Sequence, residues 1–407
     1  MLDLLITNIG TLVTPEGTGP RRGKEQGEVR SLENAAVGIQ DGKIAYVGTA
    51  ADAPSARETL DAGGRLVTPG LIDSHTHLVF GGWRHHELDL KLKGVSYLDI
   101  LKGGGGILST VRSTRAAGEE ELTERAMAFT REMLSMGVTT CEAKSGYGLD
   151  TETELKQLRV ARAVHEAQPV DIVSTFLGAH ALPQEYKENR EEFVRIVCEE
   201  MLPAVAKENL AEFCDIFCET GVFTPEETRT VLAAAKKHGF KLKAHTDEID
   251  CLGGAQVAAE LGATTTEHLI ASDDDAIAAM AKGGVTGVLL PATSFYLDKP
   301  YAPARKMLEA GMGVAVASDF NPGSSPSLNL QMAMTLACLK YRLTPEETIT
   351  AATLNAAVAV NRADTVGSIE VGKQADLVLW ETDALSYLFY RFGSNLVHKV
   401  VKNGKVV

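Results

Sequence analysis

The 407-residue sequence contains few of the patterns that mark secreted or membrane-spanning proteins. Its six cysteines are scattered and form no CxxC pair, which favours reduced thiols over a disulfide framework. No run reaches the roughly 18 apolar residues that a membrane span requires. The first eight residues include an early acid and no basic stretch, so we expect no signal peptide and a cytoplasmic protein.

Basic runs and runs of stacking aromatic residues are also missing, and aromatic residues make up only 6% of the chain. The formal net charge is −14, and such a surface repels phosphate backbones. Neither nucleic acid nor a membrane is therefore expected as a partner. Hydrophobic residues at 44% and charged residues at 23% are typical of a globular protein that can bury a large core.

Both ends of the chain are predicted to be β structure. Apolar runs at 35–40 and 43–48 flank an Asp-Gly turn, which is a strong hairpin signal. The last forty residues likewise contain two apolar runs and an Asn-Gly turn. We therefore expect residues 1–65 and 363–407 to form one small β-sandwich module.

Between the ends, over residues 66–362, strand and helix patterns alternate. The β-rich runs fall at about 66–80, 137–147, 171–180, 213–219, 241–248, 264–269, 284–293 and 313–320. Helical stretches separate them, for example 119–136 and 151–167. Eight strands alternating with helices over about 250 residues predict an α/β fold of the (β/α)8 TIM-like barrel type. A doubly wound open sheet is the alternative, but it would not explain where the polar residues lie.

Polar residues lie at the carboxyl ends of these runs. They are His75, His77, Lys144, Tyr147, His180, His245, Glu248, His268 and Asp319. In a (β/α)8 barrel the active site is built from that face. The barrel would therefore bring together residues that are far apart in the sequence.

Four of these residues predict a metal site. His75 and His77 have i, i+2 spacing, which on a strand points both imidazoles the same way. Such a pair is common by chance, but His245 and Asp319 add an imidazole and a carboxylate at two other strand ends. Three His and one Asp with an open position are typical of a catalytic metal site. Nitrogen and oxygen ligands suit zinc, iron or manganese.

In this order, these residues resemble the amidohydrolase superfamily, and the resemblance covers nearly the whole chain. Further segments make the match closer: 80–84, 103–107, 144–149, 177–180, 245–248 and 318–324. They look like the imidazolonepropionase family, whose members hydrolyse the ring C–N bond of 4-imidazolone-5-propanoate to N-formimidoyl-L-glutamate in histidine degradation. The glycine run at 103–107 is expected either to be a turn that opens a helix or to line the substrate pocket.

The resemblance implies that His75, His77, His245 and Asp319 hold one zinc or iron ion per subunit. Binuclear barrels of this class usually carry a lysine at the end of the fourth strand, and the run 213–219 has none. Asp319 would also accept the proton of the attacking water. His268 would stabilise the oxyanion or carry a proton, and Glu248 would face the substrate ring and shuttle a proton.

The implied substrate is a small molecule with a propionate tail. Arg84 is the expected clamp for that tail, because a guanidinium binds a carboxylate through two parallel hydrogen bonds. The other implied substrate contacts are Tyr147, His180, Glu248, Asn321, Gly323 and Ser324. Homodimers are common among such barrels, so the analogy also allows a homodimer.

Two other functions fit part of the pattern. A purine or pyrimidine deaminase on the same scaffold shares the His245-x-x-Glu248 motif, but its substrate carries no carboxylate for Arg84. A catalytically inactive scaffold protein would normally lose metal ligands, and all four are present.

Overall fold

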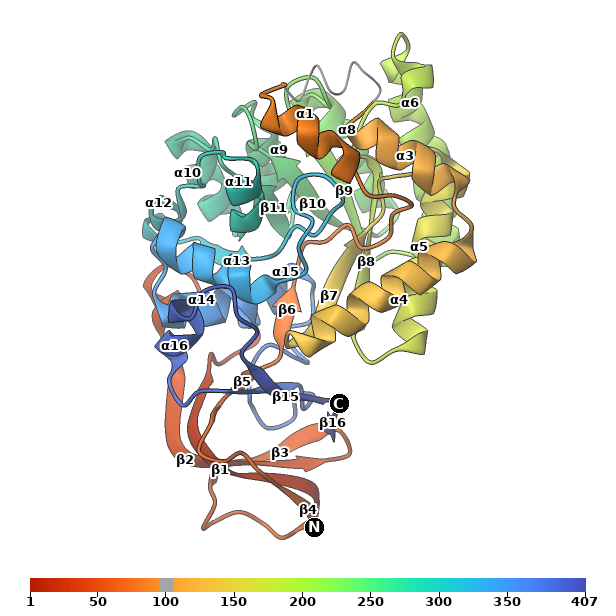
Figure 1. Ribbon diagram of the computed structural model, residues 1–407. Helices are drawn as coiled ribbons and strands as arrows, with labels where there is room; N and C mark the ends of the chain where they lie inside the picture. The colour runs from red at the N-terminus through yellow and green to blue at the C-terminus, as the bar shows by residue number, and fades with distance from the viewer. Residues whose placement is uncertain (96–104) are drawn as a thin grey trace.

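The computed structural model describes residues 1–95 and 105–407, and Figure 1 shows a barrel surrounded by helices above a separate, smaller sheet. The glycine run predicted at 103–107 lies partly outside the described residues. Its described part ends at Gly106, which immediately precedes the first residue of helix α3.

Eight parallel strands form the barrel in sequence order, which confirms the predicted (β/α)8 fold. They are β6 (Leu71–Asp73), β7 (Val138–Lys144), β8 (Asp171–Ala179), β9 (Phe213–Cys218), β10 (Lys241–Thr246), β11 (Thr265–His268), β12 (Thr286–Leu289) and β13 (Gly313–Val316). The first and last strands meet just beyond their carboxyl ends. There the His77 amide donates to the Phe320 carbonyl at 2.9 Å, and the Asp319 amide donates to the His75 carbonyl at 3.1 Å.

Helices cover the outside of the barrel. They are α1 (Leu88–Leu92), α3 (Ile107–Ala116), α4 (Glu119–Ser135), α5 (Thr151–Ala167), α6 (Arg190–Ile196), α7 (Leu202–Glu208), α8 (Pro225–Lys237), α9 (Gly254–Leu261), α10 (Asp274–Gly283), α11 (Pro291–Tyr296), α12 (Ala304–Glu309), α13 (Leu330–Leu336), α14 (Pro345–Ala352), α15 (Leu354–Ala359) and α16 (Leu385–Tyr390). None of the helices in the described part of the chain has the length and apolar character needed to cross a membrane.

The helices begin where the sequence carries capping residues. At the start of α8, Thr224 Oγ1 accepts from the Glu227 amide while the Glu227 carboxylate accepts from the Thr224 amide. Asp150 caps α5 by accepting from the Thr153 amide at 2.7 Å. These bonds satisfy backbone donors that a helix start leaves free, which is why the predicted helix boundaries agree closely with the structure.

The two chain ends form one mixed, curled sheet, which confirms that they make a common β module (Figure 1). Its strands are β1 (Leu2–Thr14), β2 (Arg30–Gln40), β3 (Lys43–Thr49), β4 (Ala56–Asp61), β5 (Leu66–Pro69), β14 (Leu377–Trp380), β15 (Val397–Lys402) and β16 (Lys405–Val406). β5 pairs with β1 and β14, so the β-rich run predicted at 66–80 contains two strands in two different sheets. The apolar run looks continuous in sequence because both strands are buried.

A buried carboxylate joins the first and last barrel strands below the closure. Asp73 accepts from the Ser318 amide at 2.9 Å and from Ser318 Oγ at 2.5 Å. Both residues are almost inaccessible to solvent. Since an ionised carboxylate without partners is costly inside a protein, these two bonds tie β6 to the segment that follows β13.

We predict that Ser318→Ala lowers the free energy of unfolding by about 1–3 kcal/mol, because it removes a donor from a buried carboxylate. Chemical denaturation monitored by circular dichroism measures this change. The exposed Ser55→Ala is the control and should stay within about 0.5 kcal/mol of the parent protein. Equal stability of the Ser318 variant and the parent would contradict the role of this contact.

Candidate metal centre and active site

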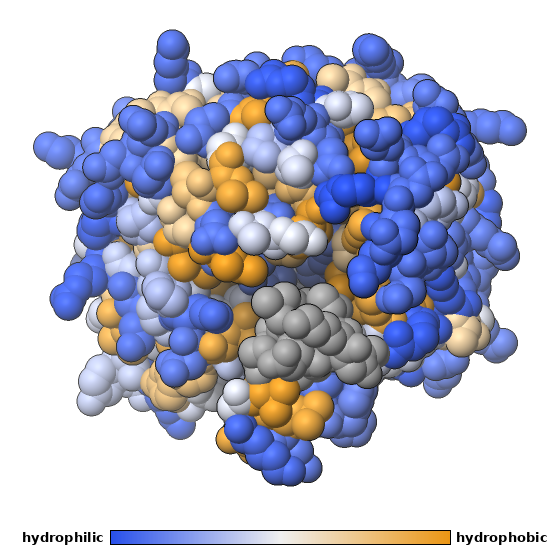
Figure 2. Space-filling model, turned by 90° about the horizontal axis from the view of Figure 1, so that it is seen from above, coloured by the Kyte–Doolittle hydropathy of each residue, from blue (hydrophilic) through white to orange (hydrophobic). Residues whose placement is uncertain are grey.

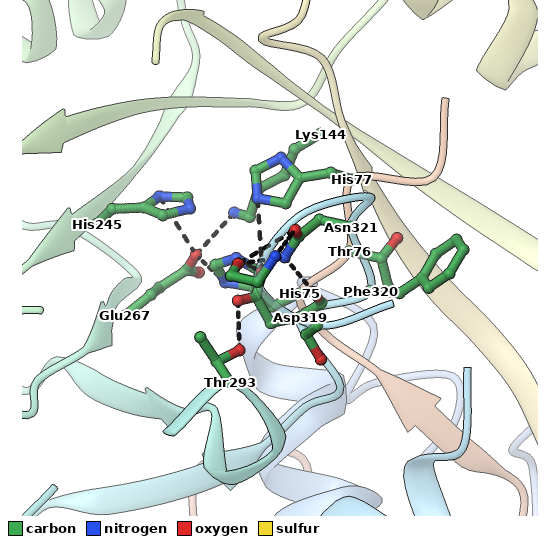
Figure 3. A network of polar contacts seen from close by, with 12 residues as sticks. His75, Thr76, His77, Lys144, His245, Glu267, Thr293, Asp319, Phe320 and Asn321 are labelled. Atoms are coloured by element: carbon green, nitrogen blue, oxygen red, sulfur yellow. Dashed lines mark hydrogen bonds and ion pairs between the residues drawn. The ribbon is translucent and has the colours of Figure 1, made fainter. Parts of the chain in front are cut away.

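Closure of the barrel brings together the predicted metal ligands that follow its first strand, His75 and His77, and the one that follows its last strand, Asp319. His75 Nε2 lies 3.3 Å and His77 Nε2 lies 3.7 Å from Asp319 Oδ1. All three side chains are buried, and Figure 3 shows them pointing toward one another at the mouth of the barrel. His75 and His77 follow β6, which ends at Asp73, so they lie beyond the predicted strand, but both imidazoles still point to the same side, toward Asp319.

Two further histidines complete this cluster. His245 follows on β10, with its ring centroid 4.6 Å from that of His75 and 5.6 Å from that of His77. His268, at the end of β11, lies 5.3 Å from His245 by the same measure. Ligand atoms of His75, His77 and Asp319, and likewise those of His75, His245 and His268, lie within 4.8 Å of one another. This spacing is close enough for one ion to be shared.

The free ring nitrogens fit a metal ion. Both ring nitrogens of His75 and of His245 are buried, and none of the four forms a hydrogen bond of ordinary geometry among the described residues. A carboxylate nevertheless lies close to Nδ1 of each ring, with His75 Nδ1 2.6 Å from Glu267 Oε2 and His245 Nδ1 3.0 Å from Asp215 Oδ2. A carboxylate at Nδ1 keeps the proton there and leaves the Nε2 lone pair for a metal.

Neutral imidazoles are the form that binds metal, and burial favours that form. Burial lowers the pKa of His75 and of His77 well below the ordinary value, and Lys144 and the neighbouring histidines lower both further. Burial also opposes the charged form of His245, but Asp215 raises the pKa of that residue. Asp319 is held from a different direction, because Thr293 Oγ1 donates to its Oδ2 at 2.5 Å. That bond leaves Oδ1, the oxygen nearest the two histidines, directed into the cluster.

Two residues of the cluster have an uncommon backbone. Asp319 has φ of 53° and His268 has φ of 74°, in the left-handed region that residues other than glycine seldom adopt. Such conformations persist only where the surrounding structure holds them, and they concentrate at functional sites. Here they turn the chain at the strand ends, where the two side chains enter the mouth.

Arg84 and Gly323 lie against each other beside this cluster. A Cβ atom on Gly323 would overlap the Arg84 guanidinium, so a larger residue at 323 would require Arg84 to move from this position. Arg84 Nε is buried without a hydrogen-bond partner in residues 1–95 and 105–407, although Glu87 Oε2 lies 3.6 Å away. A buried guanidinium with a free N–H is suited to bind an anion.

Tyr147 and His180 both lie next to His77. The His180 ring stacks on the His77 ring with centroids 4.8 Å apart, and the Tyr147 ring lies 5.4 Å from that of His180. His180 Nδ1 donates to the Gly146 carbonyl at 3.0 Å, which leaves Nε2 as an acceptor. Burial, with smaller contributions from charges that include Arg84, lowers the pKa of His180 to about 3, so the ring is neutral.

The loop that carries Tyr147 is fixed by a carboxylate. Glu154, on α5, accepts from the amides of Gly146, Gly148 and Leu149 at 2.8–2.9 Å. These bonds satisfy buried amides that no strand partner reaches, so the loop has a defined shape.

Asn321 and Ser324 lie in the loop after β13. Asn321 Nδ2 donates to the Asp319 carbonyl at 2.7 Å, and its Oδ1 accepts from the amides of Gly323 and Ser324. The structure thus gives the Asn321 side chain a loop-organising role, and its predicted contact with substrate stays a prediction.

Glu248 faces His268 across the mouth. Its Oε2 lies 3.7 Å from His268 Nε2. Burial raises the pKa of Glu248 and lowers that of His268 to about 4. An acid whose pKa is raised next to a neutral imidazole is suited to proton transfer.

Five charged residues inside the barrel had no role in the sequence analysis: Glu142, Lys144, Asp215, Lys243 and Glu267. All are almost completely buried. Although burial opposes ionisation, the charges of Lys144, Lys243 and His245 lower the pKa of Glu267 to about 2. The sequence signal was charge at i, i+2 spacing within buried strands, in Glu142 with Lys144 and in Lys243 with His245.

Figure 2 shows the barrel mouth from above, with hydrophobic residues gathered around the centre and hydrophilic residues toward the rim. Apolar side chains in the loop after β10 and in helix α11 after β12 are exposed, among them Ile249 at 57% and Phe295 at 54%. The mouth is therefore partly apolar at its surface and polar at its floor.

Comparison with known proteins identifies the family of this chain. The amidohydrolase family model matches residues 66–407. The imidazolonepropionase of Bacillus velezensis is 51% identical over 100% of this chain and 97% of its own length. That of Alkaliphilus metalliredigens is 52% identical over 100% of this chain and 98% of its own length.

Solved structures at lower identity share the fold. An adenosine deaminase from Xanthomonas campestris with bound zinc has a TM-score of 0.73 at 22% identity and covers 100% of this chain and 92% of its own. An atrazine chlorohydrolase from Arthrobacter aurescens, in complex with zinc, has a TM-score of 0.72 at 20% identity, over 99% of this chain and 94% of its own. The family match over the barrel, together with relatives about half identical along their full length, establishes that this chain belongs to the amidohydrolase family and, within it, to the imidazolonepropionases.

Proposed function

We propose that this chain hydrolyses 4-imidazolone-5-propanoate to N-formimidoyl-L-glutamate, using one metal ion held by His75, His77, His245 and Asp319. The observation that carries the proposal is Arg84, whose buried Nε has no hydrogen-bond partner in the described part of the chain, beside a histidine cluster that could hold a metal. The arrangement suits a substrate that has both a cyclic amide and a carboxylate.

The reaction adds water to the ring carbonyl carbon and breaks the ring C–N bond. One proton of the water must leave the oxygen, and one must reach the departing nitrogen. A bound zinc or iron ion would lower the pKa of a water ligand and polarise the carbonyl. The remaining tasks belong to the side chains around the mouth.

Asp319 and Glu248 are the proposed proton carriers. Asp319 Oδ1 faces the histidines, and Thr293 holds the other carboxylate oxygen, so Oδ1 can accept the proton of the attacking water. Burial raises the pKa of Glu248, which favours the protonated carboxyl that would release a proton to the departing nitrogen. His268, which faces Glu248, would hydrogen-bond the developing oxyanion.

Substrate orientation would come from the rim of the cluster. Arg84 would bind the propionate through two parallel hydrogen bonds, and Gly323 gives the guanidinium its place. Tyr147 and the neutral His180 would hydrogen-bond the ring or tail, together with Ser324. Glu87 beside Arg84 partly balances the guanidinium when no substrate is bound.

Purified, metal-replete protein should consume 4-imidazolone-5-propanoate with formation of formimidoylglutamate, followed by loss of substrate absorbance and by mass spectrometry of the product. Ammonia release from guanine or cytosine is the test of the deaminase alternative. No turnover of the imidazolone, or preferential deamination, would contradict the proposal.

Arg84→Ala should lower kcat/KM about 10- to 150-fold, which corresponds to the roughly 1.5–3 kcal/mol of a charged hydrogen bond. The effect should be confined to substrates that carry the tail. An imidazolone without the carboxylate should react equally slowly with the parent and the variant. Arg131→Ala, at an exposed position on α4, is the control and should leave kcat/KM unchanged. An unaltered kcat/KM for Arg84→Ala would show that another group binds the carboxylate.

Metal analysis should give one equivalent of zinc or iron per chain. Chelation should abolish activity and lower the melting temperature, because a ligand that binds only the folded state stabilises it by about 2.7 kcal/mol at a concentration of 100 Kd. Adding back the ion should restore both. Two tightly bound equivalents per chain, or activity unaffected by complete metal removal, would contradict a mononuclear site.

A further inference from the structure

Lys144 occupies the centre of the charged cluster beneath the proposed metal site. It ends β7, and its side chain is completely buried. Its ammonium lies 2.7 Å from Asp215 Oδ2, 2.8 Å from Glu267 Oε2 and 3.0 Å from Glu142 Oε2. Figure 3 shows the Lys144 ammonium pointing toward Glu267, with the Lys144 side chain close to His77 in this view.

Two of the three carboxylate oxygens that Lys144 contacts also lie next to histidines. Asp215 Oδ2 lies 3.0 Å from His245 Nδ1, and Glu267 Oε2 lies 2.6 Å from His75 Nδ1. The Lys144 ammonium is therefore linked to two proposed metal ligands, in each case through one carboxylate. Glu267 links it to His75, which follows β6, and Asp215 links it to His245 on β10. The other oxygens of these carboxylates have separate partners, since Asp215 Oδ1 accepts from the Ile216 amide and Glu267 Oε1 accepts from Thr265 Oγ1.

We propose that Lys144 is a positioning residue that holds Asp215 and Glu267 so that they keep the proton of His245 and His75 on Nδ1 and direct both Nε2 atoms to the metal. This inference rests on the proposed metal site. Partners behind a metal-binding histidine usually change metal affinity by 10- to 100-fold when they are removed. Here one cation would organise two such partners at once.

Lys243 is a matched control within the same cluster. Its side chain is also completely buried, and its ammonium lies 2.7 Å from Glu142 Oε1 and 3.6 Å from Glu267 Oε1. It thus contacts the opposite oxygens of the two glutamates, and neither of these oxygens forms an ion pair with a histidine of the described residues. Removing either lysine leaves buried carboxylates with one cation fewer, so both variants are expected to lose stability.

The test compares Lys144→Met with Lys243→Met, in which an unbranched apolar side chain replaces each lysine. Zinc affinity is measured by competition with a chromophoric chelator, at no more than one zinc per chain. Lys144→Met should raise the zinc Kd by 10- to 100-fold, and Lys243→Met by less than about 3-fold. Melting curves of the metal-free proteins establish that both variants fold.

A second pair of variants tests the same positioning role if Lys144→Met fails to fold. Asp215 and Glu142 both bind Lys144, but of the two only Asp215 contacts a histidine. Asp215→Asn should therefore weaken zinc binding, and Glu142→Gln should not. Nitrogen-15 spectra of the zinc-loaded parent should place the proton of His75 and His245 on Nδ1.

Equal zinc affinity of Lys144→Met and the parent, or equal weakening by the two lysine variants, would overturn the inference. Equal weakening by Asp215→Asn and Glu142→Gln would overturn it as well. A parent protein that binds no zinc or iron would instead contradict the proposed metal site itself, so the two failures are distinguishable.

Discussion

Closure of the barrel between β6 and β13 is the constraint on which the rest of the structure depends. Two backbone hydrogen bonds join the segments after these strands, from His77 to Phe320 and from Asp319 to His75. Three of the residues that make these bonds, His75, His77 and Asp319, are proposed metal ligands, and the fourth, Phe320, directly follows Asp319. The same contacts that finish the barrel therefore set the spacing of the site, and the buried Asp73–Ser318 pair supports them from below.

The interior of the barrel is organised by charge compensation rather than by apolar packing alone. Burying isolated charges is expensive, and removing one partner of a buried pair costs more than the pair contributes. Lys144 and Lys243 lie among three carboxylates, those of Glu142, Asp215 and Glu267. Glu267 also contacts His75, and Asp215 also contacts His245. Burying these lysines and carboxylates costs desolvation free energy, and the resulting network holds the proposed metal ligands in one orientation.

Sequence reasoning located the barrel and the mouth because both leave local patterns. The i, i+2 spacing of His75 and His77 predicts a shared direction, and apolar runs that end in polar residues predict the strand ends. The partners of Lys144 lie on three different strands, so no local pattern reveals that its ammonium meets Asp215 and Glu267. Similarly, the sequence does not reveal that the chain passes from one sheet to the other between β5 and β6. Both strands are fully buried, and only one glycine separates them.

The central claim is that one cation binds at the closure, on the Nε2 side of His75 and His245. The most direct test is a crystal structure of the zinc-loaded protein with anomalous diffraction recorded at the zinc edge. We predict a single anomalous peak bound by His75, His77, His245 and Asp319, with Glu267 and Asp215 still at the Nδ1 atoms. A peak among Glu142, Asp215 and Glu267, or a second peak of equal height, would contradict the account.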